Sequence, residues 1–241
     1  MSNELLWFLS LILNFVLIMF SFRVWGRKGL MIWMPISCIT ANIQVLKNIS
    51  VFGLEATLGN IVYATAFLAT DILNEFYDKK AAKTAVWYGF FSLISMTLLM
   101  QVSLLFIPSD SDMVHSSMVA LFSLMPRVTA ASLVAYLISN MHDVWAFRFW
   151  KKKTKGRFLW LRNNASTWVS QLIDSLIFTV GAFYGVYEWS ILFQIIITTY
   201  LLKWLVAVFD TVMIYLAGFW VKRGKIHDLA PDSAIYKPET V

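Results

Sequence analysis

Charge is scarce in this sequence, because only 14% of its 241 residues are Asp, Glu, Lys or Arg. A soluble domain usually carries about 25% charged residues and roughly 45–50% apolar ones. Here 59% of the residues are hydrophobic and 16% are aromatic. One aqueous core cannot bury so much apolar surface, so lipid must cover a large part of it. The composition therefore excludes a soluble globular domain.

Cysteine and histidine are also rare, which restricts the chemistry that the chain can perform. A single cysteine, Cys38, excludes an intramolecular disulfide, and its apolar surroundings are typical of an inert buried thiol. The three histidines, His115, His142 and His227, lie far apart and do not indicate a zinc site. The sequence has no Ser–His–Asp set, HExxH motif, phosphate-binding lysine loop or glycine-rich dinucleotide turn. We therefore expect no metal, no cofactor and no enzymatic activity.

Long apolar runs fill most of the chain. A membrane-spanning helix needs ~20 mostly apolar residues, and seven runs reach that length. The predicted helices occupy residues 4–22, 30–49, 57–77, 83–107, 117–140, 166–187 and 190–219. The pattern predicts an all-α, polytopic membrane bundle over residues 1–223, followed by a polar tail at 224–241 that we expect to be flexible.

Basic residues alternate between the two sides of this predicted bundle. They follow the first, third, fifth and seventh runs, at 23–28, 79–83, 148–162 and 222–225, whereas the other connections hold at most Lys47. Cytoplasmic loops of membrane proteins carry such an excess of Lys and Arg. The alternation predicts an inner-membrane protein with its N-terminus outside and its C-terminus in the cytoplasm. The net charge of +6 therefore does not indicate nucleic-acid binding.

The segment 141–165 mixes basic residues with aromatic ones such as Trp145, Phe149 and Trp160. It could be a solvated linker. A separate interfacial helix on the anionic cytoplasmic leaflet agrees better with its aromatic side chains, which favour the headgroup layer.

Ionisable and amide side chains stand inside the predicted spans, where a charged group costs roughly 2.5–3.5 kcal/mol at the bilayer centre. At ~1.5 Å per residue, five helices would bring such groups into one layer roughly 10 Å thick near the midplane. Arg127 and Lys203 would there be balanced by Asp71 and Asp174. We predict a small-molecule site built from Asn42, Asp71, Glu75, Arg127, Gln171, Asp174 and Lys203.

Two further features belong to this predicted layer. Pro126 removes a backbone hydrogen bond and could bend its helix beside Arg127, which could clamp a carboxylate. Aromatic residues at the same depth could stack on a flat ring; they are Tyr63, Phe67, Trp168, Phe178, Tyr200 and Trp204. The alternative interpretation is that the charged groups only form structural ion pairs between helices.

Four stretches together resemble the queuosine precursor transporter family. They are ATDILNEFYDKKAA at 69–82, PRVTAASLVAYLISNMHDVWAF at 126–147, NNASTWVSQLIDSLIF at 163–178, and Lys203 followed by Asp210-Thr211. Asp78 stands where that family usually has Gly, a swap that a turn accepts. The resemblance covers about residues 35–215, and it implies a six-helix core made of the second to seventh runs.

The resemblance implies uptake of 7-cyano-7-deazaguanine or 7-aminomethyl-7-deazaguanine for tRNA modification. The expected partners are this small molecule and membrane lipid, with no nucleic acid. One carboxylate, Asp174 or Glu75, could accept the two adjacent N–H donors of a guanine-type edge, and a second, such as Asp71, could meet an aminomethyl cation. Arg127, Lys203, Gln171 or Asn42 could donate to its carbonyl.

Other functions remain open from the sequence. The resemblance also suggests kinship with the substrate-binding subunits of energy-coupling-factor vitamin transporters. A retinal-type seven-helix pump would use Lys203 as its Schiff base, but Thr199 occupies the position where such proteins place Asp, and a visible absorption band would be required. A scaffold with a purely structural polar layer would lose abundance, and not specific activity, when Asp174 or Arg127 is replaced.

Overall fold

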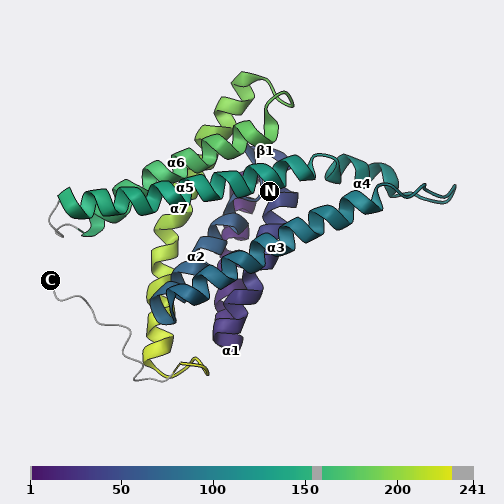
Figure 1. Ribbon diagram of the computed structural model, residues 1–241. Helices are drawn as coiled ribbons and strands as arrows, with labels where there is room; N and C mark the ends of the chain where they lie inside the picture. Colours follow the sequence, from purple (N-terminus) through teal and green to yellow (C-terminus); the bar gives the residue numbers. More distant parts are fainter. Residues whose placement is uncertain (1, 154–158, 230–241) are drawn as a thin grey trace.

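Helices form nearly all the regular structure of this protein (Figure 1). The computed structural model describes residues 2–153 and 159–229. The elements are α1 (Asn3–Gln44), β1 (Asn48–Val51), β2 (Leu54–Thr57), α2 (Asn60–Phe76), α3 (Lys79–Ser103), α4 (His115–Phe122), α5 (Met125–Lys153), α6 (Leu159–Phe183) and α7 (Trp189–Lys222). Each of the seven predicted runs is helical over most of its length, which confirms the predicted helical membrane fold.

The first two predicted runs are the two halves of α1, which is kinked at Gly26 (φ 56°, ψ −130°). L-residues with a side chain rarely adopt this conformation, whereas glycine does so without steric cost. A Cβ at this position would also lie 2.0 Å from Oδ1 of Asp228. Glycine is therefore required here for both its backbone freedom and its small size.

A β-hairpin separates α1 from α2, and the predicted helix boundaries are wrong at this point. The prediction ran the second helix to 49 and began the third at 57, but α1 ends at Gln44 and α2 begins at Asn60. In between, β1 pairs antiparallel with β2 around a turn in which Phe52 and Gly53 both have positive φ. Such a two-residue turn matches the twist of antiparallel strands.

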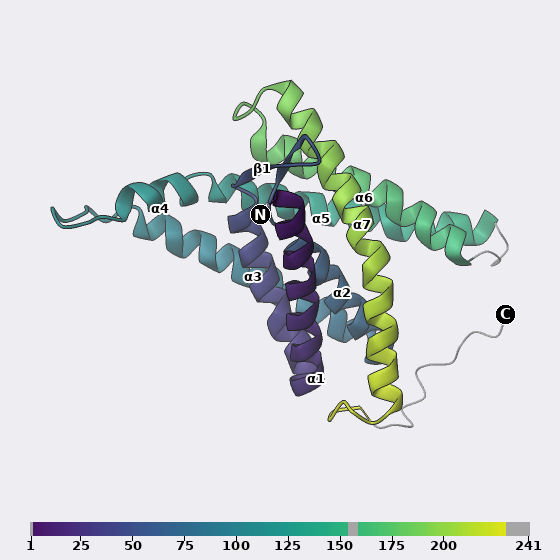
Figure 2. The ribbon, with the colours of Figure 1, turned by 180° about the vertical axis from the view of Figure 1, so that it is seen from behind.

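The hairpin is held on both sides (Figure 2). Its tip contacts the start of α1, because the Glu4 carboxylate accepts from the backbone N–H of Phe52 at 3.0 Å. Its second strand contacts α7, because the hydroxyl of Thr198 donates to the carbonyl of Glu55 at 2.7 Å. The hairpin therefore joins the N-terminal end of α1 to α7.

The fifth predicted helix is interrupted, as the position of Pro126 suggested. The short α4 ends at Phe122, residues 123 and 124 form a bend, and α5 starts at Met125. Proline is tolerated there because the first turn of a helix has free N–H groups in any case. Before α4, the Asp112 carboxylate accepts from the N–H of His115 at 2.9 Å and from that of Val114, and these bonds hold its pKa below the usual value.

The predicted interfacial helix at 141–165 is not a separate element. Residues 141–153 continue α5 and residues 159–165 begin α6, while 154–158 lie outside the described residues. Trp145 and Phe149 stack one helical turn apart, with ring centroids 5.6 Å from each other. The spacing of these aromatic residues is therefore that of one long helix, α5. The helices α5 and α6 run side by side across α1 and α7 (Figures 1 and 2).

Four helical segments in the described part of the chain are long and apolar enough to cross a membrane. They are Asn3–Gln44, Lys79–Ser103, His115–Ser139 and Trp189–Lys222, and Trp168–Phe183 is a shorter apolar helix. Large apolar side chains on α3 face outward, with Phe91 73% and Leu99 67% exposed. This surface requires lipid, so the chain is a multi-pass membrane protein.

The end of the described chain packs against the kink in α1. Ile226 is buried, and Asp228 accepts hydrogen bonds from the backbone N–H of Arg27 at 2.9 Å and from the hydroxyl of Tyr77 at 2.7 Å. Residues 224–229 therefore belong to the folded body, contrary to the expectation of a flexible tail from 224. Residues 230–241 of that expected tail lie outside the described residues.

Candidate functional site

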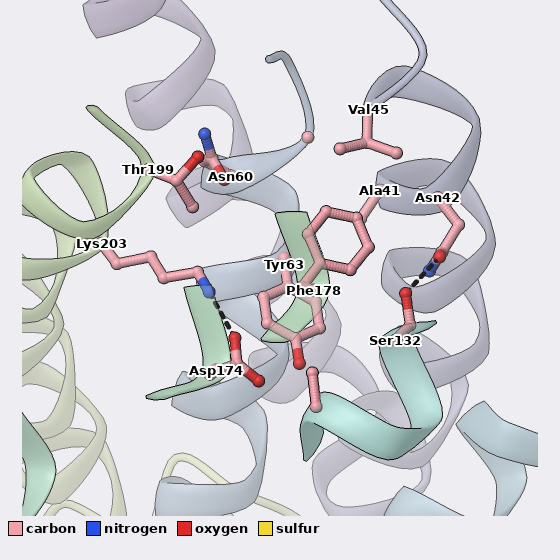
Figure 3. Close-up of a pocket in the computed structure, with 12 residues that line it drawn as sticks. Ala41, Asn42, Val45, Asn60, Tyr63, Ser132, Asp174, Phe178, Thr199 and Lys203 are labelled. Atoms are coloured by element: carbon pink, nitrogen blue, oxygen red, sulfur yellow. Dashed lines mark hydrogen bonds and ion pairs between the residues drawn. The ribbon is translucent and has the colours of Figure 1, made fainter. Parts of the chain in front are cut away.

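A cavity lies where α1, α2, α5, α6 and α7 approach one another (Figure 3). It encloses about 390 Å³, its open mouth included. Its lining residues are Ala41, Asn42, Val45, Gly59, Asn60, Tyr63, Ser132, Ala135, Asp174, Phe178, Thr199 and Lys203. Small-molecule sites usually have a mostly apolar wall with a few polar groups, and this cavity has such a wall.

A buried ion pair forms one wall of this cavity. The Lys203 ammonium on α7 lies 2.5 Å from Oδ2 of Asp174 on α6, and the two side chains are only 6% and 4% exposed. The other carboxylate oxygen of Asp174 accepts a long bond of 3.4 Å from Ser139. The same ammonium lies 5.2 Å from the ring centre of Tyr63, within cation–π distance. The pair and its contacts therefore join α2, α5, α6 and α7 around a polar centre.

Helical spacing explains why these side chains share one cavity. Thr199 and Lys203 are four residues apart on α7, and Asp174 and Phe178 are four apart on α6, so each pair shares a helix face. Small residues open the space between the faces; they are Ala41, Gly59 and Ala135. The apolar sequence thus leaves a cavity at the point where its helices cross.

A second polar link lies on the opposite wall. The Ser132 hydroxyl donates to the side-chain oxygen of Asn42 at 2.7 Å, and the Asn42 amide donates to the carbonyl of Cys38 at 2.8 Å. In Figure 3 the rings of Tyr63 and Phe178 lie between this link and the ion pair. Thr199 lines the cavity, and its hydroxyl has no hydrogen-bond partner among the described residues. A buried orphan hydroxyl is costly, so a ligand that bonds it would be favoured.

An aromatic chamber of about 470 Å³ adjoins the first cavity and shares Asn42, Tyr63 and Ser132 with it. Four of its lining residues have aromatic rings in mutual contact; they are Tyr63, Phe67, Phe90 and Tyr136. No residue that lines this chamber is Asp, Glu, Lys, Arg or His. The two chambers together provide one polar, charged end and one uncharged aromatic end.

Arg127 was predicted to belong to the site, but the structure places it outside the cavity lining. It is exposed at the start of α5 and donates to the carbonyls of Gly181 and Tyr184, at 2.8 and 2.6 Å. These carbonyls lie at the C-terminal end of α6, where a helix lacks internal donors and attracts cations. The interruption before Met125 places Arg127 at a helix end, so it stabilises the α5–α6 pair and does not line the cavity.

Three other predicted residues also lie outside the lining. Asp71 and Glu75 are exposed on α2, and the charge of Asp71 interacts with the buried Asp210 on α7. Gln171 is half-buried on α6, and its side-chain oxygen has no hydrogen-bond partner among the described residues. Equal depth along the helices did not bring these side chains together, because each helix presents them on a different face.

Of the predicted set, Asn42, Asp174 and Lys203 meet in the cavity. Of the predicted aromatic residues, Tyr63, Phe67 and Phe178 line one of the two chambers, whereas Trp168 and Trp204 are exposed. Sequence reasoning did not single out Asn60, Ser132, Phe90 or Tyr136 as site residues. Ser132 and Tyr136 lie one turn apart inside the 126–147 motif, and that spacing could have indicated them.

The comparisons with known proteins agree with this description. Residues 57–217 match a family described as "Putative vitamin uptake transporter". The chain belongs to this vitamin uptake transporter family. It is also 40% identical, over 218 residues, to a Bacillus subtilis (strain 168) protein named "Probable queuosine precursor transporter", with 90% of this chain and 95% of that protein covered. No solved structure matches it.

The vitamin uptake transporter match begins at the end of the hairpin and runs through most of α7. It therefore includes Tyr63, Asp174 and Lys203, while Asn42 lies before its first residue. The predicted six-helix core, by contrast, began at residue 30. A member of a transporter family requires a small-molecule site, and the paired chambers are the candidate for it.

Proposed function

We propose that this chain imports queuosine precursors, 7-cyano-7-deazaguanine or 7-aminomethyl-7-deazaguanine, across the bacterial inner membrane for tRNA modification. The observation that carries the proposal is the buried Asp174–Lys203 pair, set in a cavity beside an aromatic chamber. The name and the 40% identity of the Bacillus subtilis relative support the substrate class.

The chemistry of the cavity suits a guanine-type base. Such a base presents two adjacent N–H donors and a carbonyl acceptor on one edge of a flat ring. A carboxylate accepts both donors well, and Asp174 is the carboxylate that lines the cavity. Lys203 and Asn42 can donate to the carbonyl, and the aromatic chamber offers ring faces for stacking.

Contacts between basic segments support the proposed orientation in the membrane. Arg23 donates to the carbonyl of Lys225, and Arg27 and Tyr77 donate to Asp228. The segments that follow the first, third and seventh predicted spans therefore meet at one end of the molecule. Their shared Lys and Arg content supports a cytoplasmic location of that end and an N-terminus outside.

The test is uptake in bacteria that can neither make the precursor nor import it from nanomolar concentrations. Cells expressing the wild type should restore queuosine in tRNA when at least one of the two bases is supplied. Asp174→Asn should abolish this restoration at equal protein level, because an amide donates where the carboxylate must accept. Asp110→Asn is the matched control, since Asp110 is exposed in the loop before α4.

Failure of the wild type to restore queuosine, with well-inserted protein, would contradict unaided import. Binding of the bases to purified protein would then indicate a substrate-binding subunit that needs an energising partner. Absence of binding would contradict the substrate class itself.

A further inference from the structure

The charges around the cavity are balanced before any ligand arrives. Among the described residues that line the two chambers, only Asp174 and Lys203 are charged, and they pair with each other. The site therefore has one negative and one positive group and no spare carboxylate. A neutral ligand can join this pair through hydrogen bonds without changing the charge of the buried site.

A cationic ligand meets a different situation. An aliphatic aminomethyl group is protonated at neutral pH, since amines of this type titrate near 10, as lysine does at ~10.4. If its ammonium took the place of Lys203 on Asp174, the Lys203 ammonium would be left buried without a partner. If it did not, the ligand's own ammonium would be the unpartnered charge. An unpaired buried charge is strongly disfavoured in either arrangement.

The aromatic rings do not remove this penalty. The face of Tyr63, the ring shared by the two chambers, already has the Lys203 ammonium 5.2 Å from its centre. No carboxylate lines the aromatic chamber itself. The next carboxylate on α7, Asp210, is seven residues beyond Lys203, ~10 Å farther along the helix axis.

We infer that the cavity selects an uncharged base and that Lys203 excludes the cationic one. The chain then prefers 7-cyano-7-deazaguanine to 7-aminomethyl-7-deazaguanine. This inference rests on the proposed function, and it assigns Lys203 a role in specificity beyond its pairing with Asp174. Because this preference follows from charge, any uncharged 7-substituent of similar size should also be preferred to a cationic one.

The experiment measures binding of three ligands to the purified protein by calorimetry at pH 7. The ligands are 7-cyano-7-deazaguanine, 7-aminomethyl-7-deazaguanine and 7-hydroxymethyl-7-deazaguanine, the last being a neutral counterpart of the aminomethyl compound in size and shape. Both neutral ligands should bind at least ~10-fold more tightly than the cation, a difference of about 1.4 kcal/mol. This comparison uses the wild type and does not depend on any variant folding.

Two variants test whether Lys203 causes the preference for uncharged ligands. Lys203→Gln leaves Asp174 as the unbalanced charge, so the preference should reverse in favour of the aminomethyl compound. In Asp174→Asn/Lys203→Gln no charge remains, and the cation should gain no such advantage. If the double variant folds where the single one does not, its preference for the hydroxymethyl over the aminomethyl ligand should persist, because the ligand's ammonium still has no carboxylate to pair with.

The outcomes separate this inference from the proposed function. Equal or tighter binding of the cation than of its hydroxymethyl counterpart by the wild type would overturn the selectivity and leave the transporter assignment intact. An unchanged preference in Lys203→Gln would overturn the role of Lys203. Absence of binding by all three ligands would overturn the proposed function and the inference together.

Discussion

Removing the Lys203 ammonium should destabilise the folded protein, because the Asp174 carboxylate then stays buried without its partner. Breaking a buried pair in this way costs about 3–5 kcal/mol. The full cost applies here, since the side chains are 6% and 4% exposed and the other bond to the carboxylate, from Ser139, is long at 3.4 Å. For a chain of this size the loss corresponds to a drop of about 6–20 °C in melting temperature.

The assay is the fraction of detergent-purified protein that stays monodisperse after heating. Lys203→Gln and Asp174→Asn should each strongly lower the temperature at which half of the protein remains monodisperse. The double variant should lower this temperature by less than the sum of the two single changes. Lys83→Gln is the matched control, because Lys83 is exposed near the start of α3 and should tolerate the change. Strictly additive losses would refute the reasoning, since they would mean that the two charges do not stabilise each other.

Three further predictions use the same purified protein. Gly26→Ala should lower the melting temperature more than Gly53→Ala, because both have positive φ but only a Cβ at Gly26 would collide, 2.0 Å from Asp228; equal losses would contradict this. Arg127→Met should lower stability without changing ligand affinity, and a loss of affinity measured by calorimetry would place Arg127 in the site after all. Ser132→Ala should weaken ligand binding about 2–10-fold, because the cavity loses one hydrogen bond. An unchanged ligand affinity would exclude Ser132 from the binding site.

Part of the candidate site could be predicted from the sequence. Buried charge in an apolar helix is costly, so Asp174 and Lys203 stood out as soon as their helices were recognised. The same rule also selected Asp71, Glu75 and Arg127, which the structure places outside the cavity lining. Depth along a helix is a one-dimensional measure, and it does not say which neighbour a side chain faces.

Other site residues carried no signal of their own. Ser132 and Asn60 are ordinary polar residues in a membrane helix or at its start, and their importance comes from the residues across the cavity. Phe90 and Tyr136 resemble many aromatic residues of this chain until α3 and α5 bring them together in the aromatic chamber. Their selection required the packing of helices that are distant in sequence.

The sequence by itself determined the membrane class, the helical segments and the unusual polar residues within them. These properties depend on local hydrophobicity and on the distribution of charge along the chain, which are readable one segment at a time. Only the tertiary structure decided the hairpin at 48–57, the docking of Asp228 on the α1 kink, and the crossing of α5 and α6 over the other helices. Those features depend on the rotation and crossing of packed helices, which arise from contacts between distant residues, and they also determine which charges share the cavity.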